Sequence, residues 1–338
     1  MLVNVGKLMS HTSTKGGGGV KHPFNPSLVD AWFMSGLSNS DKPTQIVGVY
    51  SSLLQLKNFT YALNSGFGEY ATDFNSWAHF NPIETTSNKI MLGGIGFRNI
   101  VTTKKDVPEL KILVSGFKGD IAYKYKTGGS FSNITINDNG VYTLPASEAI
   151  INTDTDINRL YTANASSDYS GMTIELLPTA YEGALMFDGV DDYGICTGLP
   201  ILDDYTVICR REIINKDYYS VASKSTVFGK GAFIFEFIQG RTNHCYSFAA
   251  DNKISLHNSE ISWQTKNSYN GSTITVGNAD DTDTLTLGII RVEDESRRVL
   301  KGAIYYFALY NKSLTPEEVE EEKVKLENYW EGGKNELA

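Results

Sequence analysis

Residues 183–193, Gly-Ala-Leu-Met-Phe-Asp-Gly-Val-Asp-Asp-Tyr, constrain the fold of this chain more than any other stretch. Leu185 and Phe187 alternate with their neighbours, and this period of two is typical of a half-buried β-strand. The Asp188-Gly189 pair that follows is a strong signal for a tight turn. We therefore predict a strand, a hairpin turn and the start of a second strand near Tyr193, which favours an antiparallel sheet.

Further apolar runs follow this segment and are separated by Gly, Asn and Asp, at intervals of about ten residues. The predicted strands are 205–210, 226–231, 232–238, 245–249, 272–276, 285–290 and 302–309. The chain contains 19 Tyr and 16 Phe but only 6 Met, and aromatic residues suit strands better than helices. The pattern predicts an all-β protein in which two sheets pack face to face.

One helix is expected at the C-terminal end. Thr315 is a suitable N-cap, Pro316 suits the first helical position, and Glu318 completes a capping box. From there the predicted helix runs to about Trp330, and Gly332-Gly333 is expected to end it. Its inner face is predicted to hold Val319, Lys323, Leu326 and Trp330.

Four segments resemble laminin-G-like domains, which are jelly-roll sandwiches of the concanavalin A type. Residues 183–193 match the "ALxFDGxDDY" motif of these domains. Leu28–Trp32 and Leu53–Phe59 are similar to their opening strands, and Ile304–Val319 resembles their closing signature. The resemblance implies a concanavalin A-like jelly roll followed by a C-terminal helix.

The spacing of these motifs predicts an interrupted domain. In a contiguous domain of this kind, the 183–193 motif would follow the opening strands much sooner. We expect a split sandwich formed by residues 23–61 and 181–331, with an inserted β-rich domain at 62–180. Strands in the insertion are predicted at 109–116, 121–126, 133–136, 140–144 and 172–177. Residues 1–22 include four consecutive glycines and are predicted to form a flexible arm.

Two groups of residues are candidates for a binding site. Asp188, Asp191 and Asp192 offer the clustered carboxylates that calcium prefers, although Asp-Gly and Asp-Asp pairs more commonly serve as turn formers. Trp263 and Tyr269 lie in what reads as a polar loop, where their rings would stack on a sugar. Calcium is the only ion suggested by these residues, and no organic cofactor is expected. Asp280, Asp281 and Asp283 form a second acidic cluster.

The chain lacks the sequence signals of several functional classes. Its net charge is −9 and it has no basic stripe, so no nucleic-acid partner is expected. No apolar run approaches the roughly 20 residues of a membrane span, and no export signal is apparent. The odd set Cys196, Cys209 and Cys245 does not suggest a disulfide framework. These features favour folding in a reducing cytoplasm without a membrane partner.

Catalytic motifs are also missing from the sequence. Glucanases with concanavalin A-type folds carry carboxylates at fixed alternating positions on one strand, and Glu293-Asp294-Glu295 does not have this spacing. The five histidines have no metal-ligand spacing, and no serine occupies a nucleophile-elbow motif. We therefore predict that the protein is not an enzyme.

The whole layout resembles head- or tail-associated fibre proteins of crAss-like phages that infect gut Bacteroidota. Asn25–Trp32 and Tyr70–Phe74, followed by 183–193, carry this resemblance. It implies a virion structural protein that forms a homo-oligomer, usually a trimer. Residues 1–22 would attach it to other virion proteins, and the sandwich would contact polysaccharide on the host surface. The alternatives are a bacterial lectin-like carbohydrate-binding protein and a glycoside hydrolase.

Overall fold

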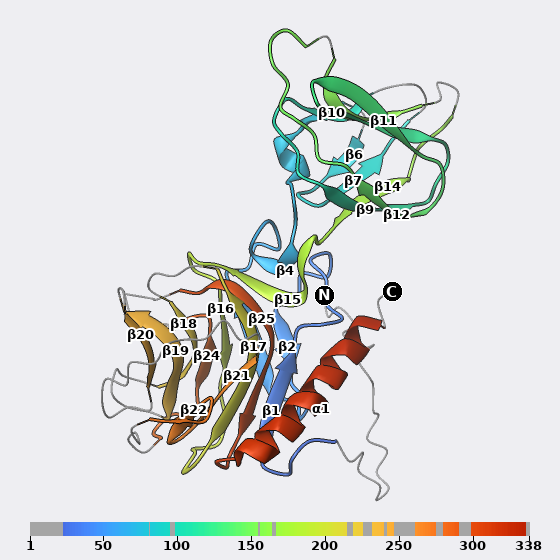
Figure 1. Cartoon of the computed structure of the whole chain (residues 1–338). Helices are drawn as coiled ribbons and strands as arrows, with labels where there is room; N and C mark the ends of the chain where they lie inside the picture. The colour runs from blue at the N-terminus through green and yellow to red at the C-terminus, as the bar shows by residue number, and fades with distance from the viewer. Residues whose placement is uncertain are drawn as a thin grey trace, which may run out of the picture. The chain divides into compact units, whose positions relative to one another are not determined.

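The computed structural model describes residues 23–80, 82–94, 99–154, 156–163, 167–214, 219–225, 232–239, 242–246, 261–274, 280–290 and 299–335. The protein is all-β, with 49% strand, 8% helix and several antiparallel sheets. The described chain divides into two compact units (Figure 1). Unit 1 combines the residues up to Tyr61 with Ser65–Phe67 and those from Gly183 onward, and unit 2 comprises Ala62–Asn64 and Gly68–Glu182.

The first sheet of unit 1 is centred on the long strand β25, Lys301–Tyr310. Along one edge of β25 lies β17, Thr206–Ile213. Along the other edge, β1 (Leu28–Phe33) pairs with the C-terminal half of β25 and β15 (Ala180–Asp188) pairs with its N-terminal half. The remaining strands of this sheet are β4 (Gly66–Glu69), β21 (Ile261–Thr265), β22 (Ser268–Tyr269) and β23 (Ser272–Thr273). Two segments far apart in the sequence thus lie end to end beside one strand.

The second sheet of unit 1 faces the first across a shared hydrophobic core. Its strands, in spatial order, are β2 (Gln45–Val47), β3 (Leu53–Lys57), β16 (Tyr193–Cys196), β24 (Leu285–Leu287), β18 (Ser220–Lys224), β19 (Phe233–Gln239) and β20 (Thr242–Tyr246). Trp32 and Phe307 from the first sheet and Leu54 and Phe233 from the second belong to this core. The alternating apolar residues therefore meet between the sheets, as their period of two requires.

The prediction of a hairpin at 183–193 is wrong. β15 ends at Asp188 and β16 begins at Tyr193, but β15 pairs with β25 in the first sheet whereas β16 pairs with β3 and β24 in the second. The turn therefore carries the chain from one sheet to the other. The Asp-Gly signal identifies a chain reversal, but it does not reveal which strands become hydrogen-bonding partners.

The helix α1, Pro316–Asn335, covers the outer face of the first sheet (Figure 1). The predicted capping box is confirmed: Thr315 N–H donates to Glu318 Oε2 at 2.9 Å, and Glu318 N–H donates to Thr315 Oγ1 at 3.2 Å. Val319, Leu326 and Trp330 are buried against the sheet, as predicted. These contacts make α1 a third layer of unit 1.

The predicted end of this helix is wrong, because α1 continues through Gly332-Gly333 to Asn335. Glycine ends a helix efficiently when it adopts the left-handed conformation, and Gly332 does not have a positive φ.

Arg210 anchors the preceding turn of α1. Its guanidinium lies 4.3 Å from the ring centre of Trp330 and donates to Glu327 Oε2 at 2.6 Å.

Unit 2 contains two five-stranded sheets around a separate core. The first has the order β11 (Ser130–Ile136), β10 (Ile121–Thr127), β13 (Asn158–Thr162), β8 (Asn99–Thr103) and β5 (Ala78–His79). The second has the order β12 (Gly140–Leu144), β9 (Leu110–Ser115), β14 (Thr173–Leu177), β7 (Lys89–Leu92) and β6 (Pro82–Thr85). Phe74, Trp77, Ile112 and Tyr123 are among its buried core residues. All five strands predicted in this part of the chain are confirmed.

The strands predicted in unit 1 agree in part with the structure. Those at 205–210, 232–238, 285–290 and 302–309 overlap β17, β19, β24 and β25. The arm at 1–22, the strand at 226–231 and the acidic run at 293–295 lie outside the described residues. In the described part of the chain, no helix is both long and apolar enough to cross a membrane.

Candidate functional site

The turn between β15 and β16 brings Asp188, Asp191 and Asp192 together. One carboxylate oxygen from each lies within 4.8 Å of the others. Asp192 is fully buried, whereas Asp188 and Asp191 are half-buried. This is the cluster that we predicted from the sequence, and its oxygen atoms are the kind of ligand that calcium prefers. Six to eight oxygens surround a calcium ion, so carbonyls or water would have to complete the set.

Two of these carboxylates, those of Asp188 and Asp192, hold the turn together by hydrogen bonds. Asp188 Oδ1 accepts the N–H of Val190 at 2.7 Å and that of Asp191 at 3.3 Å. Asp192 Oδ2 accepts the N–H of Asp188 at 3.0 Å, and its Oδ1 accepts the hydroxyl of Ser65 at 3.1 Å. Gly189 has a φ of +82° in this turn. Turn formation therefore accounts for Asp188 and Asp192 without an ion, and calcium binding stays a prediction.

Negative charge is concentrated around the buried carboxyl group of Asp192. Its pKa is raised to about 7, mainly by burial and in part by the charges of Asp188 and Asp191, while the hydrogen bonds from Ser65 and the Asp188 N–H act in the opposite direction. Burial, with a smaller effect of the Asp192 charge, likewise raises the pKa of Tyr61 to about 12. Ionisation of Asp192 is therefore costly unless a cation offsets it.

The second acidic cluster has a structural role at Asp280. Its carboxylate forms a fully buried ion pair with Lys224 and accepts the N–H of Leu202 at 2.8 Å. Burial lowers the pKa of Lys224, and the neighbouring Asp280 opposes this effect. Asp283 accepts the N–H of Gly198 at 3.1 Å. The arrangement ties the 280–284 loop to β18.

Trp263 and Tyr269 were predicted to lie in a polar loop, but the structure places them elsewhere. They belong to β21 and β22, and their side chains are only 6% and 1% exposed. Trp263 packs in the cluster beneath α1, whereas Tyr269 lies in the core between the sheets. A sugar needs an exposed ring face on which to stack, and neither residue offers one. This pair is therefore not accessible for stacking on a glycan.

Tyr269 instead belongs to a buried polar network that sequence reasoning missed. Arg211 on β17 donates to Glu236 on β19 through Nε at 2.6 Å and through a terminal nitrogen at 2.7 Å. The Tyr269 hydroxyl donates to the same carboxylate at 2.6 Å. The network joins the two sheets. Its sequence signal was a glutamate within the apolar run 233–238 and an arginine pair within a strand.

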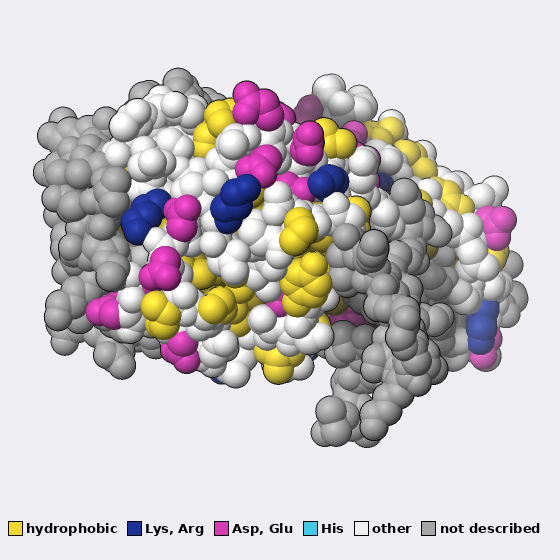
Figure 2. Space-filling model, turned by 90° about the horizontal axis from the view of Figure 1, so that it is seen from below, with side chains coloured by type: hydrophobic (Ala, Val, Ile, Leu, Met, Phe, Trp, Pro, Cys, Tyr) yellow, Lys and Arg dark blue, Asp and Glu magenta, His cyan; other side chains and the backbone are white. Residues whose placement is uncertain are grey.

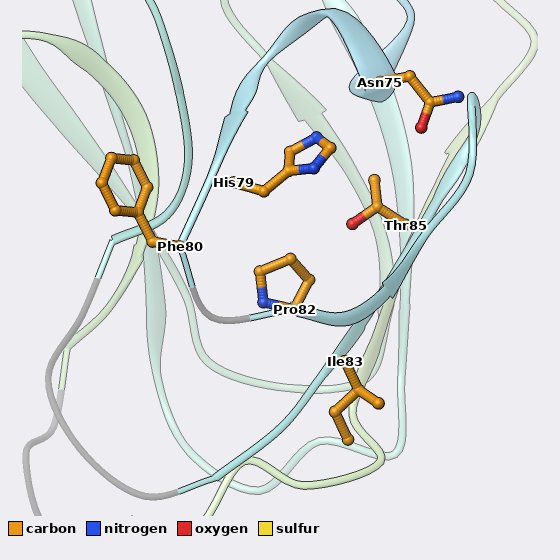
Figure 3. A pocket seen from close by; sticks show the side chains of 6 residues that line it. All are labelled: Asn75, His79, Phe80, Pro82, Ile83 and Thr85. Atoms are coloured by element: carbon orange, nitrogen blue, oxygen red, sulfur yellow. The ribbon is translucent and has the colours of Figure 1, made fainter.

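A surface depression of about 400 Å³ lies in unit 2, where the edge strands β5 and β6 follow each other in sequence. It is lined by Asn75, His79, Phe80, Pro82, Ile83 and Thr85. In Figure 3, His79, Pro82 and Thr85 surround a common space, while Phe80 and Ile83 lie on the outer sides of the two strands. The sequence around 66–80 carried no motif that predicted this site.

The charged surface gives no sign of a single-sign patch on the face that Figure 2 shows. Lysine and arginine side chains lie among aspartates and glutamates there, and apolar side chains are distributed between them. No protein-family model, curated protein or solved structure matches this chain.

Proposed function

We propose that the protein is a structural component of a phage virion, a head or tail fibre or appendage, that contacts host-surface glycans. The observation that carries this proposal is the interrupted sheet: β1 and β15 lie end to end along β25, and a second unit with its own core is inserted between them. Such a chain presents two β-sheet units from one polypeptide. This organisation suits display and adhesion.

We further propose that unit 1 is a laminin-G-like jelly roll of the concanavalin A type. Two facing sheets with one core, and a capped helix that follows the last strand, support this assignment. The motifs at 183–193 and 304–319 are the sequence features that motivate it. In the proposed virion the chain forms a homo-oligomer, expected to be a trimer.

A binding role rather than an enzymatic one is supported by the contacts of three buried carboxylates. Glu236 is held by Arg211 and Tyr269, and Asp280 is held by Lys224. Asp30 accepts the N–H groups of Ala31, Tyr50 and Ser52 at 2.8–2.9 Å. These groups stabilise packing and loops. A general acid or nucleophile instead needs access to substrate.

Mass spectrometry of purified phage particles tests the proposal. The protein is expected among the proteins of the particles. Cryo-EM of the same particles is expected to show it as a symmetric appendage, with a copy number that agrees with mass spectrometry. Absence from the particles would refute the virion role and favour the bacterial lectin-like alternative. Release of reducing ends from host polysaccharide by the pure protein would instead indicate a glycoside hydrolase.

A separate experiment tests the proposed anchoring segment. Deletion of residues 1–22 is expected to leave a folded protein that no longer enters particles. A matched full-length protein carrying Val324→Ala, an exposed position on α1, serves as the control. Normal incorporation of the deletion variant would refute anchoring by this arm.

A further inference from the structure

Strand β11, Ser130–Ile136, is an open edge of unit 2. It is the terminal strand of its five-stranded sheet, and among the described strands it pairs with β10 alone. The pairing runs without a bulge along the whole strand. The sequence of β11 is Ser-Phe-Ser-Asn-Ile-Thr-Ile, so the strand contains no charge, no proline and no glycine. An edge of this kind is able to accept a further strand.

The edges at the other end of the two sheets of unit 2 are protected against such pairing. β5, at the far end of the sheet that contains β11, consists only of Ala78–His79. β6, at the edge of the second sheet, begins with Pro82, has a bulge between Pro82 and Glu84, and carries the charge of the exposed Glu84. Short strands, prolines, bulges and charges are the features by which proteins keep sheet edges from pairing. β11 has none of these features.

The hairpin that leads into β11 determines which backbone groups of the strand face outward. The glycines of the turn, Gly128-Gly129, have φ angles of +56° and +77°, as a two-residue type I′ turn requires. Thr127 and Ser130 flank this turn and form a hydrogen-bonded pair, and from there hydrogen-bonded and non-hydrogen-bonded pairs alternate. The residues whose N–H and C=O groups point away from β10 are therefore Phe131, Asn133 and Thr135.

The contacts of Lys126 on β10 agree with this alternation. Lys126 lies opposite Phe131. Its N–H donates to Ser147 Oγ at 2.8 Å and its C=O accepts the N–H of Glu148 at 2.9 Å, so both groups face away from β11. The backbone groups of Phe131 must then face away from β10, because the two residues form a non-hydrogen-bonded pair. No residue in the described part of the chain bonds to the outward backbone groups of β11.

We propose that β11 pairs in antiparallel fashion with β11 of a second copy of this chain, about a two-fold axis at Asn133. This register places Phe131 opposite Thr135 of the partner subunit and Asn133 opposite its own copy, so all three outward residues find partners. An uncharged strand meets its copy without repulsion between like charges. Ile136, which lies in the core of unit 2, stays on the inner face of the joined sheet.

The inference goes beyond the proposed virion role and does not depend on it. Pairing about a two-fold axis gives a dimer, or a pair of trimers where the proposed trimer also forms. In either case two five-stranded sheets become one continuous sheet, and the assembly contains an even number of chains.

Sedimentation velocity of the full-length chain at increasing concentration tests the contact. Asn133→Glu is the test variant. Asn133 lies opposite Lys124 on β10, so a glutamate there suits the free chain, whereas pairing would bring two like charges together at the axis. Asn133→Lys is the complementary variant, and an equal mixture of the two variants should pair again. Ile83→Glu is the control, because it introduces the same charge at a 64% exposed position on β6.

The expected result is an even-numbered assembly whose mass each variant at Asn133 halves, because association is weakened by at least about tenfold. The mixture and the control should keep the unaltered mass. Hydrogen exchange of the segment 130–136 should slow with concentration in the unaltered protein but not in Asn133→Glu.

Three results would overturn the inference. They are a monomer or an odd-numbered assembly of the unaltered protein, a mass that Asn133→Glu leaves unchanged, and a mixture that fails to pair although both variants melt at the temperature of the unaltered protein. A trimer alone would refute the two-fold contact and leave the proposed virion role intact.

Discussion

Replacement of Asp192 by Asn is expected to stabilise unit 1 above neutral pH and to have little effect in acid. The folded-state pKa of Asp192, about 7, lies above its ordinary value of 3.8. The stability that the protonated carboxyl contributes is therefore fully present below pH 3.8 and is lost as the pH rises through 7. Asn retains the hydrogen bonds, because its carbonyl can accept the Asp188 N–H and its amide can donate to Ser65 Oγ.

The size of the effect follows from the two pKa values. At about 1.4 kcal/mol per pKa unit, the difference between 3.8 and 7 corresponds to about 4 kcal/mol as an upper limit. Asp188 and Asp191 are only half-buried, so water screens part of the repulsion. We expect the variant to exceed the wild type by about 2 kcal/mol in free energy of unfolding at pH 8.

Urea denaturation followed by tryptophan fluorescence measures this difference. Three of the four tryptophans, Trp32, Trp263 and Trp330, belong to unit 1, and Trp77 belongs to unit 2. A Trp77→Phe background therefore makes fluorescence report on unit 1 alone. Unfolding at several pH values between 4.5 and 8 gives the pH slope for each protein. Carboxylates with lowered pKa, such as Glu318, contribute equally to both proteins and cancel in the comparison.

Parallel slopes for the wild type and the Asn variant would refute this reasoning. Asp191→Asn is the graded control, because it removes one charge that raises the pKa of Asp192 and should reduce the slope only in part. Added calcium chloride extends the test to the predicted metal site. If the aspartates bind calcium, the ion should stabilise the wild type at pH 8 but have much less effect on the Asn variant.

Three further substitutions test the packing. Arg211→Met should cost about 3–5 kcal/mol, seen as a lower denaturation midpoint, because it leaves Glu236 charged and buried; an unchanged midpoint would show that the pair is dispensable. Thr315→Ala should lower the stability of unit 1 by about 1 kcal/mol through loss of the cap, whereas Thr315→Ser should not. Thr85→Val should raise the melting temperature of unit 2, because the Thr85 hydroxyl is buried without a hydrogen-bond partner; a decrease would contradict this.

Local signals in the sequence predicted local structure well. The capping box at Thr315 and Glu318 needs only residues three apart, and both of its hydrogen bonds are present. The strands of unit 2 were likewise visible from alternation, as in Ile121–Thr127. Such features depend on neighbours in the chain, so a single sequence contains what is needed to identify them.

Features that depend on distant partners were not predictable in this way. The turn at Asp188-Gly189 has the sequence of a hairpin, yet the strands beside it pair with β25 and β24, far along the chain. Trp263 was predicted to be exposed because its neighbours are polar, but it lies beneath α1. The acidic turn was found because its aspartates are adjacent in sequence. The residues that line the depression beside β5 and β6 are also close in sequence, but they form no recognisable motif.

The position of β25 has a consequence for how the chain folds during synthesis. β25, which follows all the other described strands in sequence, lies in the interior of its sheet, between β17 on one edge and β1 and β15 on the other. Unit 2 is encoded entirely upstream, so it can fold while β1 still waits for its partner. Early termination before Lys301 would remove the middle of the sheet rather than its margin, leaving three strands with open edges that invite aggregation.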